Sequence, residues 1–284
     1  MNKTITIFLF LLCYLNTYGQ KTIEISDDKR DQFFYKEMPG RIKTFGLEDL
    51  RNSTDSLRIR IWNTYSTVEI KQQNGVKACL TQWVRWSDPI IKKVEFESEI
   101  SKQLLDSLLA YDITTIPDDN KWGIDGSYVT IEISTPKKYR AYTYWSPSCF
   151  QSEDRTKVVK INNLCFKILN TKQHLQELIE TLSPGGYGLS SRPIDRFLPI
   201  GSIESSLYQE VKKRMQLKLG IDEHTSHTKF PYFIIDMKPS YMKGLNDYEL
   251  SDVKKIKILT MKDKESLIYG MMAKKGIVVI ETKE

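Results

Sequence analysis

The stretch "STVEIKQQNGVKACLTQWV", residues 66–84, decides the fold of the N-terminal half of the chain. Apolar and polar side chains alternate on both sides of Asn74-Gly75. Asn-Gly between two alternating runs is the strongest short-range signal for a β-hairpin. The preceding segment "SLRIRIW" alternates in the same way, with Arg58 and Arg60 between apolar residues. This period of two predicts a strand with one face on the core and its arginines on a solvated face.

A second hairpin follows at residues 128–145, where "YVTIEIS" and "YRAYTYW" flank the turn "TPKK". Its aromatic side chains favour cross-strand packing, although aromatic rows also bind sugars, peptides or bases. Residues 98–113 carry leucines at helical spacing, and residues 157–182 suit one long helix or two short ones. The pattern predicts an α+β fold, an antiparallel sheet with covering helices.

The composition changes at residues 183–201, which are rich in glycine and proline and are predicted to be a linker. The linker separates an α+β domain, residues 21–182, from a second domain, residues 202–284. Residues 21–50 are polar and mixed, and we expect them to form a loose N-terminal arm.

Residues 1–20, "MNKTITIFLFLLCYLNTYGQ", have the layout of a secretory signal peptide. Lys3 precedes an apolar run from Ile5 to Leu15, which is too short to span a bilayer as a helix. We expect cleavage just after Gly19 or Gln20. The mature chain is then exported and carries no transmembrane span.

Charge and cysteine content narrow the function classes. The net charge of +6 comes from 42 basic and 36 acidic residues spread along the chain, which does not indicate a nucleic-acid partner. Export permits disulfides, and Cys149 and Cys165 flank a loop that a bridge would close; pairing and free thiols both stay open. Cys79 lies on the alternating strand and is expected to be a small core residue.

Motifs for catalysis are not found in the sequence. His224 and His227 form an H-x-x-H, which holds a metal only on a helix with a further ligand, and a polar loop is the favoured interpretation. No G-x-S-x-G, phosphate loop or Cys/His spacing is present. The sequence therefore predicts no catalytic residue, no cofactor and no metal site.

The tail "DVKKIKILTMKDKESLIYGMMAKKGIVVIETK", residues 252–283, has the pattern strand, short helix, glycine turn, strand. A helix capped by Ser202 and the short strand "FPYFIID" precede it. These elements predict a small α/β sheet with its helices on one side. Its expected core consists of Ile234, Ile256, Ile258, Leu267, Ile277 and Val279.

This order of elements resembles the plug domain of TonB-dependent outer-membrane receptors, especially the SusC-like importers. The resemblance covers about residues 230–283, and the plug-motif positions are Asp236, Asp252, Tyr269, Gly270 and Gly276. Met237 stands where the family has a glycine after the aspartate. No barrel sequence follows the plug-like segment in this chain, so the resemblance implies the plug fold without transport.

The resemblance and the signal peptide together imply an envelope protein of the periplasm or of the periplasmic face of the outer membrane. The plug-like domain is expected to be an interaction module for an outer-membrane or periplasmic protein, and the N-terminal domain a binding module. The strand "IVVIETK" is expected to be an exposed edge that pairs with a partner. The alternative is an exported enzyme or inhibitor with its active site in residues 50–182.

Overall fold

The computed structural model describes residues 21–25, 36–84, 88–119, 121, 123, 126–189 and 192–283. The signal peptide predicted at residues 1–20 lies outside this range. The chain divides into two compact units, Met1–Gln82 with Lys93–Lys172, and Trp83–Lys92 with Gln173–Glu284. Both contain sheets and helices, which confirms the α+β class. Among the described residues, no helix combines the length and apolar character needed to cross a membrane.

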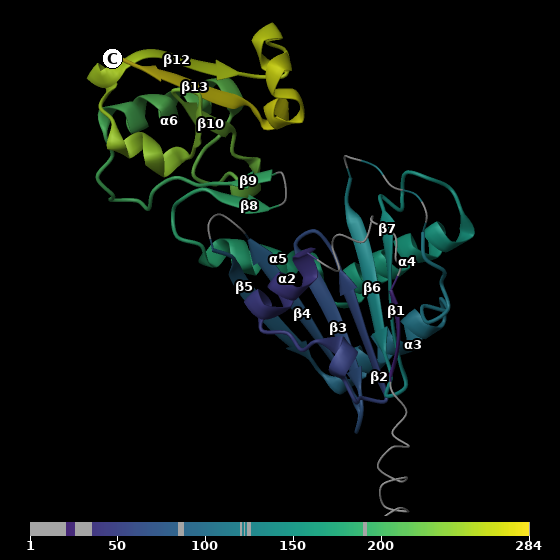
Figure 1. The fold of residues 1–284 in the computed structure, drawn as a ribbon. Coiled ribbons are helices and arrows are strands. Elements are labelled where there is room, and N and C mark those ends of the chain that lie inside the picture. The colour runs from purple at the N-terminus through teal and green to yellow at the C-terminus, as the bar shows by residue number, and fades with distance from the viewer. Residues whose placement is uncertain are drawn as a thin grey trace, which may run out of the picture. The chain divides into compact units, whose positions relative to one another are not determined.

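The N-terminal half is built on a seven-stranded sheet of order β1-β7-β6-β2-β3-β4-β5 (Figure 1). Both predicted hairpins are confirmed, since β3 pairs with β4 and β6 pairs with β7 in antiparallel register. β1 pairs with β7 in parallel, so part of the expected loose arm belongs to the sheet. The strands are β1 Thr22–Ile25, β2 Leu57–Trp62, β3 Ser66–Gln72, β4 Val76–Val84, β5 Ile90–Phe96, β6 Tyr128–Ser134 and β7 Lys138–Trp145.

Two helices, α3 (Ser98–Leu109) and α4 (Glu153–Ile168), share the main core with one face of this sheet. A second helical segment, α5 (Thr171–Thr181), follows α4 after a break at Asn170, whose φ of 43° is left-handed. The opposite face meets α2 (Met38–Phe45) and the 3-10 turn η3 (Leu50–Asn52), where Met38, Phe45 and Leu50 are buried. Tyr139, Tyr142 and Tyr144 are buried, as the packing interpretation predicts, whereas Tyr128 is 37% exposed.

The C-terminal unit contains a four-stranded sheet of order β11-β10-β13-β12. β13 (Ile277–Thr282) pairs in parallel with β10 (Tyr232–Ile235) and antiparallel with β12 (Val253–Leu259). The expectation that "IVVIETK" is an exposed edge was therefore wrong, because β13 is central. The remaining elements are α6 Ser206–Leu219, β11 Lys238–Ser240, and the 3-10 segments η4 His227–Lys229, η5 Met242–Asp247, η6 Leu250–Asp252 and η7 Lys264–Lys275.

The helix α6 supplies the main core of this unit through Leu207, Tyr208, Val211 and Met215. Its N-cap is Ser205, whose hydroxyl accepts from the Tyr208 backbone N–H at 3.2 Å, and not Ser202 as expected. Of the expected core, Ile234, Ile258 and Ile277 are buried, and Ile256 and Val279 are partly buried. Leu267 was wrongly placed there, because 73% of it is exposed.

Residues 183–201, predicted as a linker, contain a short antiparallel hairpin. Its strands are β8 (Tyr187–Leu189) and β9 (Arg192–Ile194). Leu189, Ile194 and Phe197 are buried. The prolines and glycines thus interrupt long elements without removing local order.

Candidate functional site

A network of buried charges crosses the face of the N-terminal sheet that meets α2. Arg60 on β2 lies opposite Glu69 on β3 and Glu132 on β6. Its side chain is fully buried, and Nε donates to Glu69 Oε2 at 2.7 Å while Nη1 donates to Glu132 Oε2 at 3.3 Å. The expectation of a solvated arginine was wrong, because residues 38–50 cover this face and the backbone carbonyl of Glu48 accepts from Arg60.

The network extends along the same face to the start of β2 and the end of β3. Arg58 donates to Asp55 Oδ2 at 3.0 Å and to Glu69 Oε1 at 2.7 Å, and Lys71 lies 3.0 Å from Asp55. Burial disfavours the charged form of Glu69, yet Arg60 and Arg58 lower its pKa below the usual value. These charges compensate one another, and removal of one of them would leave its partner buried without a counter-ion.

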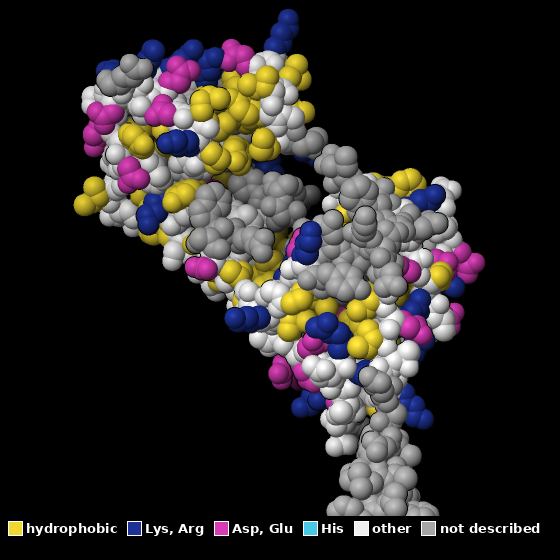
Figure 2. Space-filling view, in the orientation of Figure 1, with side chains coloured by type: hydrophobic (Ala, Val, Ile, Leu, Met, Phe, Trp, Pro, Cys, Tyr) yellow, Lys and Arg dark blue, Asp and Glu magenta, His cyan; other side chains and the backbone are white. Residues whose placement is uncertain are grey.

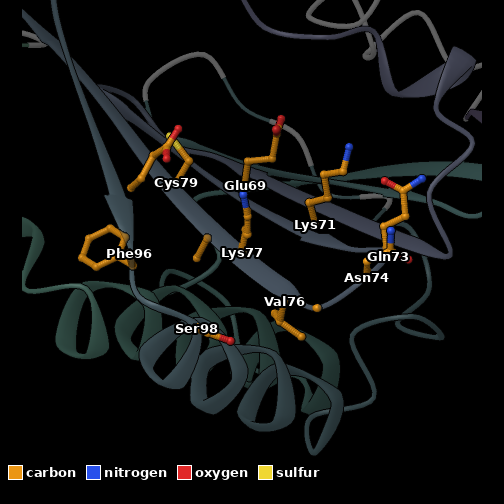
Figure 3. A pocket seen from close by; sticks show the side chains of 12 residues that line it. Glu69, Lys71, Gln73, Asn74, Val76, Lys77, Cys79, Phe96 and Ser98 are labelled. Atoms are coloured by element: carbon orange, nitrogen blue, oxygen red, sulfur yellow. The ribbon is translucent and has the colours of Figure 1, made fainter.

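A groove of about 650 Å³ opens beside this network, at the β3–β4 hairpin and the start of α3 (Figure 3). Glu69 and Lys71 project from β3, and Cys79 projects from β4. Cys79 was expected in the core, but it is only partly buried and lines the groove. Burial, followed by the nearby Glu69 carboxylate, raises the pKa of the Cys79 thiol. Among the described residues that line the groove, none is a histidine that would act as a base. A raised pKa keeps the Cys79 thiol protonated, and the protonated thiol is a poor nucleophile.

The plug-motif positions of the C-terminal unit lie at two opposite ends of β13. Asp236 and Asp252 lie near its last residues. The Asp236 carboxylate accepts from the Thr282 N–H at 2.8 Å and the Thr282 hydroxyl at 2.7 Å. The carbonyl of Asp252 accepts from the Lys283 N–H at 2.7 Å, and its carboxylate accepts from the Glu249 N–H at 2.8 Å. Both aspartates therefore fix the end of the sheet.

The turn after Asp236 is tight although the next residue is Met237 and not a glycine. Asp236 and Met237 have φ values of 46° and 64°, and they connect β10 to β11 with Ile235 opposite Lys238. Both central residues with positive φ are the signature of a type I′ hairpin turn. Aspartate tolerates this conformation, whereas methionine adopts it at a cost.

Tyr269, Gly270 and Gly276 lie at the other end of β13. Tyr269 packs against the small cluster around Ile277, and Gly270, with φ of 53°, separates two helical turns of η7. Gly276 has φ of 94°, and a Cβ there would lie 2.9 Å from the methyl carbons of Leu219. These positions shape the fold, and they do not converge on one cavity with the two aspartates.

A second groove, of about 490 Å³, lies between the edge strand β12 and the C-terminal half of α6. Arg214, Leu217 and Lys218 line it from the helix, residues 256–259 line it from the strand, and Glu265 closes one side. Leu217 is 78% exposed, and Lys218 Nζ donates to the backbone carbonyl of Ile258. We call this feature the β12 groove.

The backbone of β12 offers hydrogen-bonding groups to this groove. Ile256 lies opposite Ile280, whose carbonyl accepts from Asp236 N–H at 3.0 Å on the β10 side. Ile256 and Ile280 are therefore a non-hydrogen-bonded pair, and the backbone groups of Ile256 point away from β13. Ile258 has the same orientation, as the Lys218 contact with its carbonyl shows. Sequence reasoning missed this groove because it assigned the edge to β13.

Residues considered as metal ligands or disulfide partners stay apart. His227 lies in η4, and within the described residues no three His, Cys, Asp or Glu side chains form a group that would hold a metal ion. Cys149 is exposed, Cys165 is buried, and both are free thiols.

No family model, no curated protein and no solved structure matches the chain.

Proposed function

We propose that the protein is an exported binding protein of the cell envelope, whose plug-like C-terminal unit holds an extended segment of a partner protein. The β12 groove carries this proposal. β12 is the last strand of its sheet, and its outward backbone groups at Ile256 and Ile258 face a groove walled by α6. A peptide bound between an edge strand and a helix gains main-chain hydrogen bonds from the strand and side-chain contacts from the helix.

Basic side chains outnumber acidic ones in the lining of the groove, where Glu265 pairs with Lys257, and this balance favours an acidic segment. Arg214 and Lys218 line the α6 side, and Lys254 and Lys255 are exposed on β12. Lys218 Nζ donates to the Ile258 carbonyl, and a backbone N–H of an incoming strand would replace it there. The Lys218 ammonium would then face the bound segment. A carboxylate on the segment then meets Lys218, and an apolar side chain meets Leu217. This pattern also limits unspecific pairing, because lysines along an edge strand oppose sheet-to-sheet aggregation.

The N-terminal unit supports binding as its role in the same protein. Its groove at the β3–β4 hairpin combines the Lys71 ammonium, the amides of Gln73 and Asn74, and a Cys79 thiol whose pKa is raised. The alternative of an enzyme in residues 50–182 would need an activated nucleophile or base in this groove. The features described above favour a module that holds a polar ligand.

The test places a photoreactive amino acid at Leu217 and, as a control, at exposed Leu109 on α3. Crosslinking in the envelope fraction should trap a partner from Leu217 and not from Leu109. Ile256→Pro should abolish the crosslink, because it removes the outward N–H while leaving the β12–β13 ladder intact. Ile256→Val keeps this N–H and should retain the crosslink. Equal crosslinking of the Pro and Val variants, both folded by circular dichroism, would contradict strand addition.

A further inference from the structure

The segment η7 exposes large apolar side chains on the surface of the C-terminal unit. Leu267 is 73% exposed, Ile268 79% and Met272 47%. We call these three residues the η7 patch. Hydrophobic side chains gather on this unit around the place of η7, with Lys and Arg side chains beside them (Figure 2). Neighbouring exposed apolar side chains that form a contiguous patch are candidates for an interaction surface.

The residues that flank the patch members in the sequence turn inward and hold the patch outward. Ser266 and Ala273 are buried, and Tyr269 packs with Ala273 on Ile277. The segment is anchored at its start by Asp263, whose carboxylate accepts from the Thr260 N–H at 2.6 Å. The inner side of η7 is therefore fixed on the sheet while the patch faces solvent. This arrangement is a built feature of the fold and does not result from fraying of a chain end.

Lysines surround the patch, and the acidic residues near it, Asp263 and Glu265, already have hydrogen-bond or ion-pair partners. Lys262, Lys264 and Lys274 are exposed, and in the part of the chain that the structure describes none of them forms an ion pair. We call them the flanking lysines. Glu265 pairs with Lys257, and Asp263 bonds to Thr260 and lies 3.8 Å from Lys218. The charge that the patch presents is therefore positive.

We propose that the η7 patch inserts into the surface of an anionic lipid bilayer, with the flanking lysines against the headgroups. Apolar side chains rimmed by lysine are typical of segments that lie in the membrane interface. Lysine is depleted in the apolar core of protein interfaces, and η7 is a helical segment without the edge strand that the β12 groove offers to a peptide, so a protein partner fits this surface less well. The contact is peripheral, and it does not depend on the β12 groove.

The experiment measures co-sedimentation of the chain from Lys21 onward with vesicles of phosphatidylglycerol and phosphatidylcholine. This start keeps every described residue and removes the apolar run of residues 5–15, which would itself partition into lipid. Binding should be strong to mixed vesicles, weak to pure phosphatidylcholine, and reduced at high salt because salt screens the lysines. Replacing the three flanking lysines with glutamine should weaken binding roughly tenfold to a hundredfold.

The decisive variant is Leu267→Asp with Ile268→Asp, which should lower partitioning roughly tenfold or more. Its matched control is Ile200→Asp with Ile203→Asp, because these residues are 98% and 91% exposed and the change in charge is the same. The control should bind like the parent chain, and circular dichroism should show both variants folded. Equal loss in both pairs would overturn the proposal, since net charge alone would then explain binding. Absence of vesicle binding by the parent chain would also overturn it and leave a protein surface as the occupant.

Discussion

Glu132 is the residue whose replacement tests the buried charge network most directly. Its fully buried carboxylate accepts from Arg60 Nη1 at 3.3 Å, from Trp62 Nε1 at 2.5 Å and from Tyr139 Oη at 2.9 Å. Glu132→Gln keeps the shape of the side chain and removes its charge. Arg60 then has Glu69 as its remaining counter-ion, and one of the three donors meets an amide N–H₂ in place of an oxygen.

The expected cost follows from these contacts. Removing one partner of a buried ion pair costs about 3–5 kcal/mol, because the other charge stays buried without compensation. Such a loss is a large share of the roughly 5–15 kcal/mol that stabilises a typical domain. It should lower the unfolding midpoint of the N-terminal unit by roughly 10 °C.

The assay is urea unfolding of the full chain followed by tryptophan fluorescence, since Trp62 contacts the network. The cycle comprises Glu132→Gln, Arg60→Met and the double variant. We expect the double variant to cost less than the sum of the single variants by at least about 1 kcal/mol, because it removes both charges. A loss under about 1 kcal/mol for Glu132→Gln, or strict additivity, would refute the claim that these charges depend on each other.

Three further outcomes are expected. Gly276→Ala should destabilise the C-terminal unit by about 1–3 kcal/mol, because the φ of 94° disfavours a side chain and a Cβ would lie 2.9 Å from Leu219. An unchanged midpoint in chemical denaturation would contradict this expectation. Met237→Gly should stabilise the same unit by up to about 1 kcal/mol, since glycine adopts the observed φ of 64° without strain. A lower denaturant midpoint for this variant would be inconsistent with the turn described. Burial raises the pKa of Asp195 to about 7, so the folded state binds this proton more tightly than the unfolded chain does. The free energy of unfolding should therefore rise by about 2.5 kcal/mol from pH 8 to pH 5, and Asp195→Asn should remove this part of the pH dependence. An identical profile for Asn would exclude Asp195 as its source.

The two grooves show which parts of a candidate site can be predicted from the sequence. Lys71, Gln73 and Cys79 are all visible in the first hairpin, but their shared groove depends on the start of α3, which comes later in the chain. The β12 groove needs α6 against a strand that begins at Val253, and nothing local to either segment indicates the pairing. The plug-motif positions were predicted through the resemblance alone; in the structure Asp236, Gly270 and Gly276 have positive φ at turns, and the Asp252 carboxylate caps a 3-10 segment.

The sequence by itself determined the local conformations. Alternation around Asn74-Gly75 and in residues 128–145 gave the hairpins, helical spacing gave α3 and α4, and these periods report backbone geometry directly. Tertiary structure alone decided which surfaces are covered. Residues 38–50 bury Arg60, whose alternation had indicated a solvated face, and parallel pairing with β10 makes β13 central. Leu267 has the pattern of a core residue and is exposed, because Ser266, Tyr269 and Ala273 occupy the inner side of η7. Periodicity defines the two sides of an element, but segments distant in the chain decide which side meets water.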